Sequence, residues 1–153
     1  MLDKIPEKTR FQLLGEITAL CMNSDLHSKY RVYDIANNFL PPINLDQFRI
    51  YKKGDMPIAL ITWAFLNEET ENKYINQQYD LSLNDWRSGD RLWFIDFIAT
   101  KDVIKQIEHD LKNNLFPNQM AKALRADQTG KVNHIQEYYG INYKNSKTNI
   151  YQN

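Results

Sequence analysis

The chain has 153 residues, of which 42% are hydrophobic and 25% charged, so it has the size and apolar content of one folded domain. Its 19 basic and 19 acidic residues give zero net charge, which argues against a basic nucleic-acid-binding arm or an acidic solvating tail. The single cysteine, Cys21, excludes a disulfide framework and a cysteine-based metal cluster.

No apolar run approaches the roughly 18 residues that a membrane span needs, and the N-terminus lacks a signal-peptide core. We therefore expect a cytoplasmic protein without a transmembrane segment. Residues 144–153 are polar and poorly periodic, so we expect a frayed tail behind a single domain over residues 1–143.

The first half of the chain predicts two helices and a β-hairpin. Residues 7–22 place apolar side chains at helical spacing. Residues 33–40 repeat that pattern up to a Pro-Pro pair, which should end the second helix because proline lacks the N–H group. Two β-rich segments, 48–53 and 57–67, flank a Gly-Asp turn in the pattern of a hairpin.

The second half predicts further helices and strands. Residues 67–78 are charged and suit a short helix, and residues 91–99 are apolar at both alternating sets of positions, as in a central strand covered on both faces. A helix over 102–115 and two strands over 121–127 and 131–138 complete the order. This order predicts an α/β domain with a mixed central sheet and flanking helices.

Asp96 lies inside the predicted central strand. In a regular strand it shares a face with Phe94 and Ile98, where its carboxylate loses water at a cost of several kcal/mol unless a partner compensates. Asp96 is then either structural, paired with a backbone N–H or with an arginine such as Arg91 or Arg125, or functional. The residues alone leave both interpretations open.

His27 follows the first helix, in a loop of the kind that often carries catalytic groups, and histidine exchanges protons near neutral pH. A lone loop histidine is nevertheless more often a surface residue. Ser24 could be a nucleophile with His27 as its base, although a cap or turn role is favoured. His109 and His134 are expected to be surface residues, and the wide spacing of the three histidines argues against a metal site.

Two segments carry a specific pattern: W-x-S-G-D-R-x-W-F-I-D from Trp86 to Asp96, and S-x-L-H over residues 24–27. Together with N-F-L-P-P-I over 38–43 and weaker matches, they span about residues 11–140. In these segments the chain resembles the RTX toxin-activating lysine acyltransferases of the haemolysin-activating type.

The resemblance implies an enzyme that attaches fatty acyl groups to internal lysines of an inactive RTX protoxin. It implies an acyl carrier protein thioester as co-substrate, no bound cofactor, and a homodimer. The implied fold is similar to that of the Gcn5-related N-acyltransferases. The essential histidine of the family maps onto His27 and its conserved aspartate onto Asp96.

The implied chemistry suits these residues. A lysine amine is protonated at neutral pH and must lose a proton before it attacks a thioester. His27 would take that proton, and Asp96 would hold the tautomer and stabilise the imidazolium. Candidate donors to the oxyanion are Asn38, which could equally be a helix cap, and backbone N–H groups near Asp96.

The five glycines never form G-x-G, and the chain lacks the glycine-bearing turn with which related acetyltransferases hold coenzyme A. A protein-bound donor needs no such turn, since acyl carrier proteins are acidic and can dock by charge. The basic residues near the motifs that would form this docking patch are Lys29, Arg31, Arg87 and Arg91.

Two other functions fit the sequence less well. One is a coenzyme A-dependent N-acetyltransferase acting on a small amine, and the other is a non-catalytic toxin-binding partner. Basic and aromatic residues are not interleaved as in nucleic-acid-binding proteins. The sequence leaves open whether transfer is direct or passes through an acyl-enzyme at Ser24, and which toxin, lysines and acyl length are used.

Overall fold

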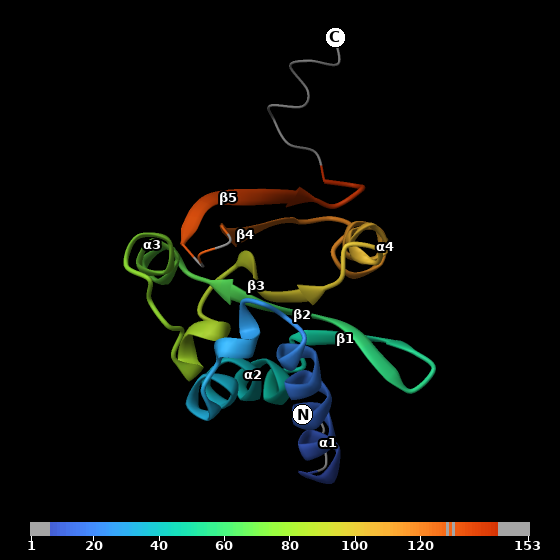
Figure 1. Ribbon diagram of the computed structural model, residues 1–153. Coiled ribbons are helices and arrows are strands. Elements are labelled where there is room, and N and C mark those ends of the chain that lie inside the picture. Colours follow the sequence, from blue (N-terminus) through green and yellow to red (C-terminus); the bar gives the residue numbers. More distant parts are fainter. Residues whose placement is uncertain (1–6, 128, 130, 144–153) are drawn as a thin grey trace.

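The computed structural model describes residues 7–127, 129 and 131–143, which form a curved sheet with helices on both faces (Figure 1). The predicted tail over 144–153 lies outside the described residues. In chain order the elements are α1 (Glu7–Met22), the 3₁₀ turn η1 (His27–Lys29), α2 (Val32–Leu45), β1 (Phe48–Lys53), β2 (Met56–Leu66), α3 (Glu68–Asn76), the 3₁₀ turn η2 (Leu83–Trp86), β3 (Arg91–Ala99), α4 (Ile104–Asp110), the π-helical turn η3 (Leu111–Leu115), β4 (Met120–Ala126) and β5 (Val132–Tyr139).

The five strands lie in the order β1-β2-β3-β4-β5, and all neighbours are antiparallel except β3 and β4, which are parallel. The sheet is therefore mixed and β3 is its central strand, which confirms the predicted α/β class and the predicted β1–β2 hairpin. Within the described part of the chain, no helix is long and apolar enough to cross a membrane.

Each face of the sheet has its own apolar cluster. On one face, Ile107 of α4 and Leu111 of η3 pack with Phe94 of β3. On the other face, α1 and α2 lie together (Figure 1), and Ile17 and Phe39 from these helices are fully buried. A third cluster, built by α3, η2 and the strands, continues this second face toward β4.

The second helix does not end where its prolines predict. Pro41 and Pro42 lie inside α2, which continues to Leu45 and ends at Asp46, a residue in the left-handed conformation with φ 55°. A proline inside a helix removes a hydrogen bond and costs about 3 kcal/mol. Both prolines are buried beside Ile43, so packing against the core offsets that cost and carries the helix through them.

Between two of its pairs with β2, β3 contains one extra residue. Ile61 lies opposite Phe97 and Trp63 lies opposite Phe94, so Thr62 alone faces two residues of β3. This β-bulge breaks the alternation of side chains. As a result Phe94 and Phe97 both pack in the cluster on the α4 face.

The bulge corrects the predicted orientation of Asp96. Asp96 does not share a face with Phe94, but turns toward η1 together with Ile98, which packs against α1 and α2. The prediction that Asp96 is buried is confirmed, since its exposed fraction is 5%. The extra backbone N–H of the bulge, that of Asp96, donates to Thr62 Oγ1 at 3.0 Å.

β3 and β4 separate after a short contact. Their pairing covers three positions and ends at Phe94 and Ala123. Beyond this point, β3 pairs only with β2 and β4 only with β5 among the described residues. The two parallel strands therefore diverge at the level of the bulge, and a gap in the sheet opens beside Asp96.

We expect Thr62→Val to destabilise the protein more than Thr62→Ser does, although valine is closer to threonine in shape. Valine leaves the Asp96 N–H unpaired in the core, which costs about 1–3 kcal/mol. Serine keeps the hydroxyl and loses one methyl group, worth about 0.8 kcal/mol. Urea unfolding of the two variants measures the difference, and a valine variant as stable as the wild type would contradict this role of Thr62.

Candidate active site

The loop between α1 and α2 turns His27 into the core. The backbone N–H of Ser28 donates to the carbonyl of Ser24 at 2.8 Å, and that of Tyr30 donates to the carbonyl of His27 at 3.0 Å. The backbone N–H of His27 donates to Ser24 Oγ at 3.3 Å, so Ser24 is a turn residue as expected. The His27 side chain is only 4% exposed, which separates it from an ordinary loop histidine.

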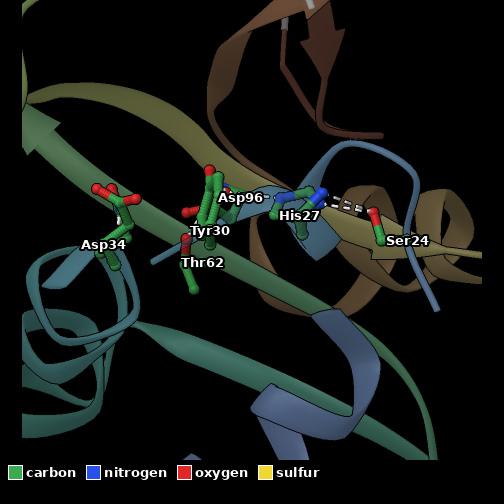
Figure 2. A network of polar contacts seen from close by, with 7 residues as sticks. Ser24, His27, Tyr30, Asp34, Thr62 and Asp96 are labelled. Carbon is green, nitrogen blue, oxygen red and sulfur yellow. Dashed lines mark hydrogen bonds and ion pairs between the residues drawn. The ribbon is translucent and has the colours of Figure 1, made fainter. Parts of the chain in front are cut away.

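Both nitrogens of the His27 ring have an oxygen partner. Nε2 lies 2.9 Å from Asp96 Oδ1, and Nδ1 lies 2.7 Å from Ser24 Oγ (Figure 2). Since a carboxylate can only accept, neutral His27 carries its hydrogen on Nε2 and accepts the Ser24 hydroxyl at Nδ1. Ser24, His27 and Asp96 thus form a chain of polar contacts, in which His27 and Asp96 lie 69 positions apart in the sequence.

Two side chains meet the Asp96 carboxylate at Oδ1, and no arginine or lysine among the described residues forms an ion pair with it. Tyr30 donates its hydroxyl to Oδ1 at 3.2 Å, and its ring lies 5.0 Å from the His27 ring. Burial and the Asp96 charge raise the pKa of Tyr30 well above its ordinary value, so the phenol keeps its proton. The other carboxylate oxygen, Oδ2, is buried without a hydrogen-bond partner among the described residues.

The structure brings together three of the residues singled out in the sequence, Ser24, His27 and Asp96. Asn38 is not part of this cluster, because its side-chain amide donates to the carbonyl of Asp34 one turn earlier in α2 at 2.8 Å. It is not a helix cap either, since α2 continues beyond it. Asn38 instead lines a small cavity next to Asp96.

The four basic residues of the proposed docking patch have different surroundings. Arg91 pairs with the buried Glu71 at 2.6 Å, and Arg87 donates to Gln47 and to a backbone carbonyl. Arg31 is exposed and pairs with Asp34 at 3.1 Å. Lys29 is exposed, lies in η1 beside His27, and has no ion pair within the described ranges.

A cavity of about 350 Å³ lies where β3 and β4 diverge, and His27 and Asp96 form part of its wall. Apolar side chains of both strands line it together with Arg125, whose guanidinium lies 5.6 Å from the centre of the Phe97 ring. The cavity has the mixed lining that suits a ligand with a long apolar part and a polar reacting end. His27 and Asp96 are polar groups of the lining that could meet such an end.

Sequence reasoning missed Tyr30, Thr62 and Tyr74. Tyr30 and Tyr74 line the cavity beside Asp96, and Thr62 supports the bulge. No motif or spacing identifies these residues, because each one reaches Asp96 from a different element. Arg125 was considered only as a partner of Asp96, but it bonds Gln136 and Tyr138 instead.

No group of three or more histidine, cysteine, aspartate or glutamate residues that could hold a metal ion occurs in the part of the chain that the structure describes. The contacts of His27 itself suit proton chemistry. If the imidazole takes up a proton, both of its N–H groups already have an acceptor, Ser24 Oγ and Asp96 Oδ1. Nδ1 is the basic nitrogen of neutral His27, and it can take a proton from a bound group once the Ser24 hydroxyl hydrogen turns away from it.

Comparison with known proteins identifies similar sequences over the same region. The sequence model of the RTX toxin acyltransferase family matches residues 6–139. Protein-lysine myristoyltransferase RtxC of Kingella kingae is 41% identical over 134 residues, which cover 87% of this chain and 79% of the relative. RTX-I toxin-activating lysine-acyltransferase ApxIC of Actinobacillus pleuropneumoniae is 39% identical over 130 residues, 85% of this chain and 75% of that protein.

A shorter relative is also similar. The uncharacterized protein sll0720 of Synechocystis sp. is 43% identical over 131 residues, which cover 84% of this chain and 89% of the relative. The region matched by the family model contains the whole Ser24–His27–Asp96 cluster and both diverging strands.

Cys21 provides a chemical test of the charge on Asp96. Burial, and after it the Asp96 charge, raises the pKa of the Cys21 thiol from 9.0 to about 11. At pH 8 a pKa of about 11 leaves about one thiol in a thousand ionised, against about one in ten at a pKa of 9.0. We expect iodoacetamide to label folded protein at least about 100-fold more slowly than urea-unfolded protein, with a rate that rises up to pH 10.

Asp96→Asn removes the charge and should lower the Cys21 pKa, so that labelling of the folded variant becomes faster at pH 8. Mass spectrometry of the alkylated protein measures both rates. An unchanged rate in a folded Asp96→Asn variant would show that Asp96 carries no charge near Cys21.

Proposed function

Since the chain belongs to the RTX toxin acyltransferase family, we propose that it transfers a fatty acyl group to internal lysines of an RTX protoxin and thereby activates it. The names of two relatives state lysine acylation, and one of them states toxin activation. The observation that carries the proposal is the buried His27–Asp96 pair in the wall of the 350 Å³ cavity.

His27 is the general base in this proposal. A lysine ammonium must lose a proton before its nitrogen can attack a thioester, and a neutral imidazole is the side chain best matched to that task near neutral pH. Asp96 Oδ1 fixes the ring and stabilises the imidazolium that forms. Ser24 Oγ can reverse its hydrogen bond, from donor to acceptor, when Nδ1 becomes protonated.

Direct transfer from donor to lysine is the proposed route. Ser24 contacts His27 but does not belong to the lining of either cavity beside Asp96, so a thioester held there does not meet the serine hydroxyl. Ser24 is then a positioning residue for the imidazole. The oxyanion would be met by main-chain N–H groups at the edges of β3 and β4 that face each other beyond Phe94 and Ala123.

The donor we propose is the thioester of an acyl carrier protein. The gap between the diverging strands can admit the narrow arm of a carrier and its acyl chain, and Leu26, Phe97 and Leu124 give it apolar walls. A mixed sheet that opens between two parallel strands also supports a fold of the Gcn5-related N-acyltransferase type. The chain has no glycine-bearing turn for coenzyme A, which favours a protein-bound donor.

The experiment incubates the protein with acylated carrier protein and a candidate protoxin, and locates acylated lysines by peptide mass spectrometry. We expect His27→Ala to lower the transfer rate by at least about 100-fold, the usual scale for loss of a general base. His109→Ala is the matched control, because His109 is an exposed histidine on α4. Near-normal transfer by a folded His27→Ala variant would remove the proposed base, and equal transfer from acyl coenzyme A would contradict the proposed donor.

Lys29 tests electrostatic docking of the acidic carrier. Lys29→Glu reverses the charge beside His27 and should raise KM for the carrier about threefold to tenfold at low salt, with kcat nearly unchanged, since docking charges act mainly on association. Lys8→Glu makes the same change at the far end of α1 and should leave KM unaltered. Added salt should raise KM of the wild type and have less effect on Lys29→Glu. Equal KM values for all three proteins would contradict docking at η1.

A further inference from the structure

A second cavity, of about 160 Å³, lies on the other side of Asp96, between α2, the segment from α3 to η2, and β3. Its walls include the aromatic rings of Tyr30, Tyr74, Tyr79 and Trp86. It shares Tyr30, Tyr74, Ile95 and Asp96 with the larger cavity at the diverging strands. The two cavities therefore meet at Asp96. The proposed function assigns a ligand only to the larger one.

Two buried polar atoms without a partner belong to residues of the smaller cavity. Asp96 is 5% exposed and its Oδ2 has no hydrogen-bond partner among the described residues. Trp86 is 1% exposed and its Nε1–H also lacks an acceptor there. Buried polar groups in proteins are nearly always paired, so the unpaired Asp96 Oδ2 indicates a place for a hydrogen-bond donor. The Trp86 N–H is itself a donor and would need an acceptor.

The lining of the cavity has a negative charge. Asp80 and Asp96 are the charged residues among those that line it, and none of the lining residues is basic. Asp80 is exposed, which places one carboxylate on the solvent side, while Asp96 lies in the core. The carboxylate of Asp80 can attract a cation from solvent, and that of Asp96 can bind it inside the cavity.

The aromatic walls also suit a cation on an alkyl chain. Tyrosine faces pack against methylene groups and attract ammonium groups by their quadrupole. The ammonium of Lys73 lies 5.7 Å from the centre of the Tyr79 ring. One ring of this cavity therefore already makes a cation–π contact with a lysine of the same chain.

We propose that the 160 Å³ cavity binds the side chain of the acceptor lysine, with its alkyl stem between the tyrosine rings and its ε-ammonium on Asp96 Oδ2. This inference rests on the proposed function, because it assigns the acceptor subsite of that reaction. The acyl donor then occupies the larger cavity and the lysine the smaller one. One carboxylate then contacts both groups, with the ammonium on Oδ2 and the Nε2–H of His27 on Oδ1.

A binding experiment without turnover tests the site. The chain has three tryptophans, so the indole N–H region of a ¹⁵N NMR spectrum should resolve Trp86, assigned through Trp86→Phe. n-Butylammonium, which reproduces the end of a lysine side chain, should shift the Trp86 signal in a saturable manner. n-Butanol has the same length without the charge, and we expect it to bind at least about fivefold more weakly. The same loss is expected for butylammonium with Asp96→Asn.

A kinetic experiment uses the rim of the cavity. Asp80→Lys should raise KM for a lysine-containing acceptor peptide about fivefold at low salt, while KM for the acyl donor and kcat stay within about twofold. Asp55→Lys is the matched control, since Asp55 is an exposed aspartate in the β1–β2 turn. It should change none of these parameters.

The outcomes separate this inference from the proposed function. The lysine site is overturned if the Trp86 signal does not shift with butylammonium. It is also overturned if the acceptor KM is the same in Asp80→Lys and Asp55→Lys. Neither result contradicts the proposed acyltransferase activity. Saturable, charge-dependent binding in a protein that transfers no acyl group supports an alkylammonium site and overturns the proposed reaction.

Discussion

The hydrogen bond from the Asp96 N–H to Thr62 Oγ1 holds one extra residue in the central strand, and the polar cluster depends on that residue. Without the bulge, Asp96 would face α4, in an apolar cluster without a polar partner. With it, the carboxylate faces η1 and reaches His27. The bulge also lies where β3 leaves β4, so a single irregularity both orients the acid and places it beside the larger cavity.

Asp96 is a buried carboxylate held by hydrogen bonds, and neither lysine nor arginine pairs with it in the described part of the chain. His27 and Tyr30 bind Oδ1, and Oδ2 stays unpaired among the described residues. Leaving a buried acceptor unsatisfied costs roughly 1–3 kcal/mol, which a purely structural aspartate has no reason to incur. The same carboxylate raises the pKa of Cys21, Tyr30 and Tyr74, in each case after the effect of burial. The unpaired oxygen and the negative charge thus lie where the two cavities meet.

The helices support this arrangement through packing rather than through their local preferences. α2 continues through Pro41 and Pro42 because both rings are buried beside Phe39 and Ile43. Before the prolines, α2 places Asn38 in the wall of the smaller cavity and the Phe39 ring 6.2 Å from that of Tyr30. A helix that ended at Leu40, as the prolines predict, would leave the second face of the sheet with less cover.

The sequence by itself determined the elements with strong periodicity, the α/β class with its mixed sheet, and the family through the S-x-L-H and W-x-S-G-D-R-x-W-F-I-D segments. It also identified His27 and Asp96, but only the resemblance joined them, because 69 residues separate them and no local rule relates the two. The tertiary structure decided the face of Asp96, the length of α2 and the partners of Arg91 and Arg125. These depend on strand register and core packing, which are set by contacts between distant residues. Periodicity describes one element at a time. The effect of an inserted residue in β3 or of a buried proline pair in α2 can therefore be determined only after the elements are packed together.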